Sequence, residues 1–275
     1  MKSVDTFLDH RVRKLIEGYL VTKPDALPVD LDEVARLSGV LSIEEREMIP
    51  EAVLSPGRKG FRIYLQSNFI GDPNSRVRRR FSLAHEIAHT LFYDLRGGVP
   101  KPVAKSPRGD DLEDACHRGA RLLLIPQRFL AQELRRIGQP IGADHVIELS
   151  RKFEVSVEAM LRRLDQAGAF ESAETALVLV RSLERRNATI KLALPYPPWL
   201  KVLMPPPSRD VSFASWLRPS VPDVRQAEPR IRHGSDRDVD VLFEKGLQLQ
   251  TNLGTLRVSP FSVTRSQHVF ELRLE

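Results

Sequence analysis

The chain has 275 residues, and its 42 lysines and arginines against 36 aspartates and glutamates give a formal net charge of +6 at pH 7. At roughly 100 to 200 residues per domain, this length predicts two domains with a core that needs no disulfide bond. The single cysteine excludes a multi-cysteine zinc module. With 41% hydrophobic and 28% charged residues, the chain is too apolar to be disordered throughout.

The N-terminal segment and the hydropathy pattern predict a cytoplasmic protein. Lys2, Asp5 and Asp9 interrupt the first nine residues, which therefore lack the continuous apolar stretch of a secretory signal. A run of about 18 uncharged apolar residues, as a membrane span requires, does not occur in the sequence. The excess positive charge is spread along the chain and indicates nucleic-acid binding only weakly.

The first predicted elements are two helices and a hairpin. Residues 11–20 predict an amphipathic helix, and residues 30–38 predict a short capped helix that ends at Gly39. Segments 52–54 and 61–66 flank the turn sequence Ser-Pro-Gly-Arg-Lys-Gly and predict a hairpin. The second strand is either an ordinary sheet strand or a free edge to which an extended peptide substrate can add.

The next predicted helix runs from residue 76 to about residue 93. Asn74 or Ser75 serves as its N-cap, and Gly97 and Gly98 mark its end. One apolar stripe, expected to face a core, is formed by Val77, Phe81, Ala84, Ala88 and Leu91.

Beside that stripe lies the HExxH pattern of zinc metallopeptidases, formed by His85, Glu86, Ile87, Ala88 and His89. Histidines four residues apart project from one helix face, so both imidazoles can reach one ion. The alternative is a pair of partly exposed helix histidines without a ligand. A catalytic zinc takes three protein ligands and a water, and the chemistry of the third ligand is met by Asp110, Asp111, Glu113 and Asp114 alike.

Residues 78–89 and 113–126 resemble the ImmA/IrrE family of metallopeptidases, and the likeness extends over roughly residues 8–165. In that family the third metal ligand is a glutamate thirteen residues before a closing proline, which in this chain corresponds to Glu113 before Pro126. The resemblance implies a zincin-like helical metallopeptidase core. It also implies that His85, His89 and Glu113 bind Zn²⁺.

These roles imply a hydrolytic mechanism. Bound zinc lowers the pKa of its water towards about 7 and polarises the scissile carbonyl. Glu86 is the expected catalytic residue, taking the water proton and returning it to the leaving amine. Tyr93, His117 and Arg80 are candidates for stabilising the oxyanion, although each is more often structural.

Three positions near this site depart from the family pattern. The family usually has asparagine at the position of His117, a bulky aromatic residue at that of Gly119, and alanine at that of Cys116. His117 lies one turn after Glu113 and is either a group that supports the ligands or a competing ligand. Cys116 is expected to be a buried small hydrophobe, with a thiol that senses zinc or oxidants as the alternative.

A helix-turn-helix-like element is predicted within residues 127–165. Its helices are expected at 129–136, 145–152 and 157–164, with Ser156 as the cap of the last one. DNA phosphates could contact its cations, which are Arg151, Lys152, Arg162 and Arg163. We expect instead a solvated face of helices that complete the peptidase domain, and nucleic acid is not the expected partner.

After Gly168 the sequence predicts a sheet-rich domain. Short strands are expected at 176–180, 189–194, 211–214, 239–243, 247–250 and 269–274. Nine prolines between residues 195 and 229 exclude long helices there. The alternating Asp236, Asp238 and Asp240 are expected on a solvated edge, with a cation-binding face as the alternative. In the radiation-response branch of the family a GAF-like sensor domain is present, and a C-terminal domain of this length fits that arrangement.

We therefore predict an α+β protein with a zinc metallopeptidase domain at 1–167 and a sheet-rich sensor or substrate-recognition domain at 168–275. As the resemblance implies, it is a zinc-dependent endopeptidase that cleaves a helix-turn-helix transcriptional repressor and derepresses stress-response or mobile-element genes. The first alternative is a DNA-binding transcriptional regulator with a vestigial peptidase core. The second is a partner in a toxin system that acts by binding only.

Overall fold

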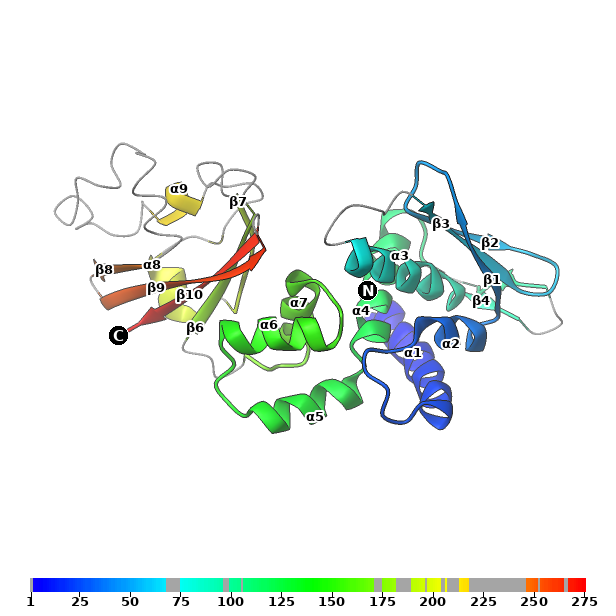
Figure 1. Ribbon diagram of the computed structural model, residues 1–275, viewed down its shortest axis with the longest axis horizontal. Coiled ribbons are helices and arrows are strands. Elements are labelled where there is room, and N and C mark those ends of the chain that lie inside the picture. The colour runs from blue at the N-terminus through cyan, green and yellow to red at the C-terminus, as the bar shows by residue number, and fades with distance from the viewer. Residues whose placement is uncertain are drawn as a thin grey trace. The chain divides into compact units, whose positions relative to one another are not determined.

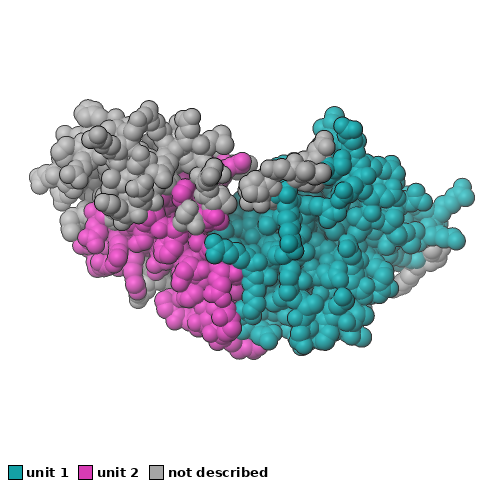
Figure 2. All heavy atoms as spheres, in the orientation of Figure 1, with its two compact units in different colours: residues 1–133, 150–159 teal, residues 134–149, 160–275 magenta. Residues whose placement is uncertain are grey.

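The computed structural model describes residues 2–67, 75–95, 99–104, 106–170, 175–181, 189–195, 197–203, 206, 213–217, 246–251, 253–264 and 267–275. Its elements are drawn in Figure 1. The chain divides into two compact units, coloured in Figure 2: residues 1–133 with 150–159, and residues 134–149 with 160–275. The domain boundary expected at residue 167 stays a prediction.

Two helices open the first unit. Helix α1 (Lys2–Thr22) buries Leu8, Val12 and Ile16, which recur every four residues, and its predicted amphipathic part is confirmed. Helix α2 (Leu31–Leu37) begins at Asp30, whose carboxylate accepts hydrogen bonds from the Asp32 and Glu33 amides at 3.1 and 3.3 Å. It ends before Gly39, whose φ of +87° suits glycine, as predicted.

A three-stranded sheet follows, with strands β1 (Val40–Arg46), β2 (Ala52–Pro56) and β3 (Phe61–Gln66). Strands β2 and β3 pair antiparallel, which confirms the predicted hairpin, and β1 pairs with β3 in parallel. The order is β1-β3-β2, so β3 is the central strand. The alternative in which residues 61–66 offer a free edge is therefore wrong, because both edges of that strand are hydrogen-bonded; β2 is an edge strand instead.

Helix α3 (Ser75–Thr90) carries the HExxH residues and ends earlier than expected. The chain leaves the helix because Tyr93 and Asp94 form strand β4 (Tyr93–Asp94), which pairs with β5 (Lys101–Pro102). This pairing ends the helix before it reaches residue 93. Asn74, Gly97 and Gly98, the predicted cap and stop residues, lie outside the described residues.

Helix α4 (Asp110–Leu124) packs very closely against α3. A Cβ added to Gly119 would lie 2.9 Å from the Cβ of Ala88, a distance that real Cβ atoms do not tolerate. The bulky aromatic residue of the family pattern therefore cannot occupy this position in the present packing. Arg118 of the same helix donates two hydrogen bonds to Asp9 of α1, at 2.8 and 2.9 Å, and also pairs with Asp5.

Three helices are expected after Pro126, and the structure has α5 (Gln127–Ile137), α6 (Ala143–Lys152) and α7 (Val157–Gln166). The Ser156 hydroxyl accepts a hydrogen bond from the Ala159 amide at 3.1 Å, which confirms the predicted cap. The expectation of a solvated basic face is wrong at Arg163, which is only 3% exposed. Lys152 is exposed, as expected, and donates to the buried Glu133 at 2.7 Å.

The second unit contains an antiparallel sheet with the order β7-β6-β10-β9-β8. Four predicted strands are confirmed, as β6 (Thr175–Arg181), β7 (Thr189–Leu194), β8 (Leu247–Thr251) and β10 (Gln267–Leu274). Strand β9 (Gly254–Thr264) is not among the predicted strands. Its Pro260 interrupts the strand pattern that the sequence would otherwise show.

Two short helices occupy part of the proline-rich interval, α8 (Pro198–Leu203) and α9 (Phe213–Leu217). The strand expected at residues 211–214 is wrong at Phe213, which begins α9 because Phe213 and Trp216, one turn apart, both pack into the core of the sheet. The Phe213 and Phe270 rings lie 4.4 Å apart. The strand expected at 239–243, Asp236, Asp238 and Asp240 all lie outside the described residues.

Candidate metal centre

Helices α3 and α4 bring three predicted ligands to one point. The Nε2 atoms of His85 and His89 are 3.1 Å apart, and Glu113 places its Oε2 3.1 Å from His85 Nε2 and its Oε1 3.7 Å from His89 Nε2. The ligand atoms of all three residues lie within 4.8 Å of one another. Two of them come from one helix face, whereas Glu113 comes from the first turn of the next helix.

These distances fit a tetrahedral metal site. With metal–nitrogen and metal–oxygen bonds of about 2.0–2.1 Å, two ligands of a tetrahedron lie about 3.4 Å apart, between the observed 3.1 and 3.7 Å. Two imidazole Nε2 atoms that face each other can share at most one proton, whereas a cation between them engages both lone pairs. The donor set of two imidazoles and one carboxylate is one that zinc accepts.

Burial keeps both imidazoles ready to bind a metal. Burial, together with the neighbouring His89 and His117, lowers the pKa of His85 to about 4. Burial also lowers the pKa of His89, and the Glu113 carboxylate opposes that shift. Neutral imidazoles are the form that binds metal. The buried Nδ1 of His85 has no hydrogen-bond partner among the described residues.

Glu86 lies on α3 between the two histidines but is not one of the converging ligands. It is only 8% exposed, and this burial raises its pKa to about 7 despite a hydrogen bond from the backbone of Leu54. A carboxylate with a pKa near neutrality can both accept and return a proton. The residue predicted as the proton carrier thus has an environment suited to that role.

A polar stripe on α3 holds β2 beside Glu86. Arg78 and Ser82 precede Glu86 by eight and four residues, so the three lie on one helix face. Glu51, next to β2, accepts hydrogen bonds from Arg78 Nε at 2.7 Å and from Ser82 Oγ at 2.8 Å. The bond between the backbone of Leu54 and Glu86 continues the same line of contacts. Glu51 and Ser82 are not among the residues predicted from the sequence.

Two of the positions that depart from the family pattern, His117 and Cys116, have different surroundings. The His117 ring packs against His85 with centroids 4.5 Å apart, and its Nδ1 is 2.8 Å from the Glu113 carbonyl oxygen. His117 thus contacts His85 and Glu113 but is not one of the converging residues. Cys116 is fully buried, and burial raises the pKa of its thiol, so the structure favours the small hydrophobe that is expected there.

The other candidates have different surroundings. Arg80 donates to the carbonyl of Val29 at 3.0 Å, and its Nε lies 3.5 Å from the Glu154 carboxylate. Tyr93 packs edge-on against Phe61, with centroids 5.3 Å apart. Both contacts are structural. The remaining acids in the first turns of α4, which are Asp110, Asp111 and Asp114, are exposed and are not in the converging group.

The face of α4 contains the signal that separates Glu113 from those acids. Cys116, Ala120 and Leu123 are buried at helical spacing, and Glu113 continues their stripe towards the N-terminus. Charge alone could not identify the third ligand.

Comparisons with known proteins point to a metallopeptidase family. Residues 58–165 match the model of the IrrE N-terminal-like domain, a peptidase family. The radiation response metalloprotease IrrE of Deinococcus deserti is 32% identical over 120 residues, which are 42% of this chain and 41% of that protein. The protein of the same name from Deinococcus radiodurans is 32% identical over 92 residues, 32% of this chain and 27% of that protein. The matches thus span less than half of the length of these relatives.

The structural match to a Mycobacterium tuberculosis transcriptional regulator covers 98% of this chain and 79% of the regulator, at 12% sequence identity and a TM-score of 0.40. A TM-score of 0.40 is too low to support a shared fold. Among the described residues, we find no helix long and apolar enough to cross a membrane. The resemblance read from the sequence is confirmed by the family match and by both relatives. Residues 58–165 of this chain are therefore similar to the IrrE N-terminal-like domain of a peptidase family.

Proposed function

We propose that this chain is a zinc-dependent endopeptidase with a protein substrate. The observation that carries the proposal is the convergence of His85, His89 and Glu113 within 4.8 Å, beside a buried Glu86 that does not join them. Two neutral imidazoles and a carboxylate form the ligand set of many catalytic zinc sites, in which a fourth position is left for water. The family match supports a metallopeptidase.

In the proposed mechanism, zinc when bound supplies Lewis acidity and an acidified water. The Glu86 carboxylate accepts the proton of the attacking water and delivers it to the leaving amine. Its pKa of about 7 makes both transfers accessible near neutral pH. His117, packed on His85, fixes the orientation of that imidazole, a task that outer groups commonly perform for metal ligands.

The edge strand β2 is the proposed binding surface for an extended peptide. Strand β3 hydrogen-bonds one side of β2, and the Leu54 backbone bonds to Glu86. The outer edge of β2 therefore runs beside the proposed proton carrier. A substrate that adds to this edge as a further strand would present its backbone next to Glu86.

The finer parts of the proposal rest on the resemblance to the ImmA/IrrE family. They are a cytoplasmic location, a helix-turn-helix repressor as substrate, derepression of stress-response or mobile-element genes, and a sensor or recruitment role for residues 168–275. The ion pair between Lys152 and Glu133 and the burial of Arg163 leave fewer cations for DNA in the helix-turn-helix-like element. These contacts favour proteolysis over DNA binding as the function of the chain.

Proteomics tests the proposal even though the substrate is unidentified. Zinc-loaded wild-type protein and its Glu86→Gln variant are incubated with protein extracted from the source cells, and new N-termini are identified by mass spectrometry. We expect a small set of termini that depends on Glu86. Identical termini with both proteins, or none with either, would reject the endopeptidase assignment. Salt-sensitive DNA binding that survives substitution of His85 and His89 would support the regulator instead.

A further inference from the structure

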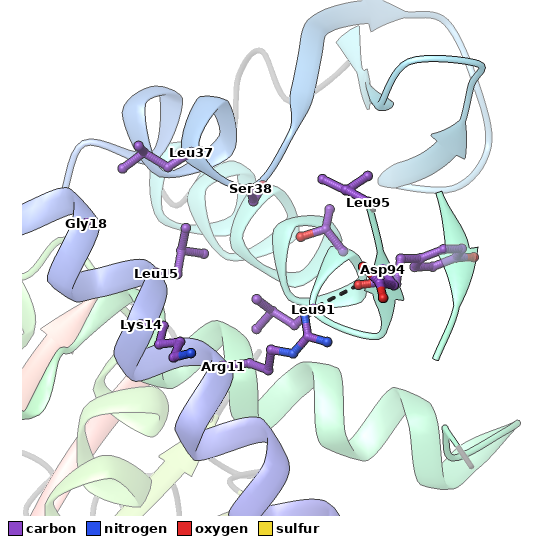
Figure 3. A pocket seen from close by; sticks show the side chains of 11 residues that line it. Arg11, Lys14, Leu15, Gly18, Leu37, Ser38, Leu91, Asp94 and Leu95 are labelled. Atoms are coloured by element: carbon purple, nitrogen blue, oxygen red, sulfur yellow. Dashed lines mark hydrogen bonds between the residues drawn. The ribbon is translucent and has the colours of Figure 1, made fainter. Parts of the chain in front are cut away.

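A cavity in the first unit is lined by none of the proposed metal ligands. Figure 3 shows it among α1, the C-terminal ends of α2 and α3, and β4. Its volume is about 510 Å³, within the range of about 300–1,000 Å³ that small-molecule sites occupy. Its lining residues come from segments far apart in the sequence, and the predicted chemistry of the chain assigns no role to this cavity.

The wall of the cavity is largely aliphatic. Leu15 lies on α1 and Leu37 at the end of α2, while Leu91 precedes β4 in the chain and Leu95 follows it. Leu95 is 38% exposed, and Leu15 and Leu37 are half-buried. These side chains therefore leave apolar surface in contact with solvent. A ligand that covered it would gain roughly 25 cal/mol for each Å² removed from water.

Two positively charged side chains also line the cavity. Arg11 and Lys14 are three residues apart on α1, and both line the cavity. Arg11 makes a long hydrogen bond of 3.5 Å to the Tyr93 carbonyl and lies 5.1 Å from the centroid of the Phe7 ring. Neither cation forms an ion pair with any residue that the structure describes. Asp94 also lines the cavity, and it has an interaction partner of its own.

The remaining polar side chains offer few protons to a ligand. The Ser38 hydroxyl donates to the Ala35 carbonyl at 2.8 Å, and the Thr90 hydroxyl donates to the Ile87 carbonyl at 2.6 Å. Because each hydroxyl has a single proton, neither of these two side chains has a proton left for a ligand, and the cationic donors in the lining are Arg11 and Lys14, with the neutral Tyr93 hydroxyl as a further lining group. The ligand that matches them has an apolar body and an anionic head.

We propose that this cavity binds a small amphipathic anion, a carboxylate with an aliphatic chain of about ten carbons, a size suited to a cavity in this range. The carboxylate lies beside Arg11 and Lys14, and the chain lies against the leucines. A free fatty acid and an aliphatic carboxylate of other origin share this chemistry. The cavity is then a ligand site separate from the proposed peptidase centre.

Gly18 provides a direct way to fill the cavity. It lines the cavity from α1, and a Cβ added there meets nothing within 4 Å. Gly18→Leu therefore inserts a side chain into open space, while Gly18→Ala changes helix propensity in the same direction and leaves most of the volume free. For the cations, the double variant Arg11→Gln/Lys14→Gln is matched by Arg13→Gln, because Arg13 is an exposed arginine of the same helix outside the lining.

Calorimetry on the metal-free full-length chain tests the site with decanoate, decanol and decyltrimethylammonium as probes. We expect decanoate to bind wild type, Gly18→Ala and Arg13→Gln alike. Its affinity should fall about tenfold or more in Gly18→Leu and in the double variant, since each removes an interaction on the order of 1.4 kcal/mol. Circular dichroism checks that each variant is folded.

Three results would overturn the proposal: no decanoate binding, decanol bound as tightly as decanoate, or decanoate affinity unchanged by both Gly18→Leu and the double variant. The assay measures neither zinc nor proteolysis, so its failure would leave the proposed peptidase function untouched.

Discussion

The two sides of helix α3 are fixed by different kinds of contact. Towards α4 the contact is steric, because Ala88 meets Gly119 with no room for another Cβ. Towards β2 the contact is polar, with Arg78 and Ser82 bound to Glu51 and Glu86 bound to the Leu54 backbone. The steric side sets the distance between the histidines and Glu113, whereas the polar side sets the environment of Glu86. Substitutions on the two sides should therefore have different consequences.

The largest effect is expected on the steric side. Gly119→Leu should destabilise the protein by about 3 kcal/mol, because the core cannot accept the added volume, and should separate Glu113 from His85 and His89. Denaturant unfolding and zinc titration measure the two effects. Two glycine-to-alanine substitutions serve as the control. Gly18→Ala should raise the free energy of unfolding by up to about 1 kcal/mol through helix propensity, whereas in Gly119→Ala the close contact with Ala88 should cancel this gain. Equal gains in both would show that α3 and α4 are not closely packed.

On the polar side, the burial of Glu86 should make the stability of the protein depend on pH. Folding raises the pKa of Glu86 from 4.5 to about 7 because the side chain is buried. The protonated form is therefore favoured in the folded state, and the stability associated with it is present below pH 4.5 and lost as the pH rises through 7. In metal-free protein, Glu86→Gln should match wild type near pH 4 and exceed its stability at pH 8, by on the order of 3 kcal/mol at most. A difference that is constant across this range would contradict the buried environment of Glu86.

A smaller effect is expected where β2 is anchored. Glu51→Gln should lower the free energy of unfolding by about 1 kcal/mol, because it weakens the hydrogen bonds from Arg78 and Ser82. The partial exposure of Glu51 keeps the loss small. Glu45→Gln is the matched control, since Glu45 is 57% exposed and pairs with Arg79, and it should change stability by less than about 0.5 kcal/mol. Chemical denaturation of the two variants provides the measurement. Similar costs for both would mean that the polar stripe does not anchor the strand.

The smallest effect on the metal centre is expected from Cys116, which lies on the buried side of α4. Its thiol is fully buried, so Cys116→Ala should cost about 1 kcal/mol of stability through lost packing and should leave zinc affinity and oxidant sensitivity unchanged. Zinc titration before and after peroxide treatment tests this. A loss of zinc affinity in the variant would instead support the alternative that the Cys116 thiol takes part in the metal site.

The same comparison explains what the sequence could predict. The pair His85 and His89 lies within a single helix, so its geometry follows from the helical repeat alone. Glu113 is 28 residues from His85, so the helical repeat of α3 cannot select it among the four acids. The family resemblance selected it, and its helical spacing to the buried Cys116 and Ala120 is a second signal for the same residue. Glu51 and Ser82 escaped prediction because their contact spans 31 residues and joins two ordinary polar side chains.

The fold followed the same rule. The hairpin at β2 and β3 and the short capped helix α2 depend on neighbouring residues and were predicted. The central place of β3 depends on parallel pairing with β1, which no local pattern encodes. In the second unit, β9 contains Pro260 and α9 is stabilised by packing of Phe213 on Phe270, so tertiary contacts override the local signal at both.

The most direct test of the central claim compares two isosteric substitutions, Glu86→Gln and Glu113→Gln, in zinc affinity and in proteolysis. The account predicts that Glu86→Gln binds one zinc with the affinity of the wild type and cleaves nothing, while Glu113→Gln loses about tenfold or more in zinc affinity because a metal ligand has been removed. Zinc affinity lost in Glu86→Gln and kept in Glu113→Gln would contradict the assignment of both carboxylates.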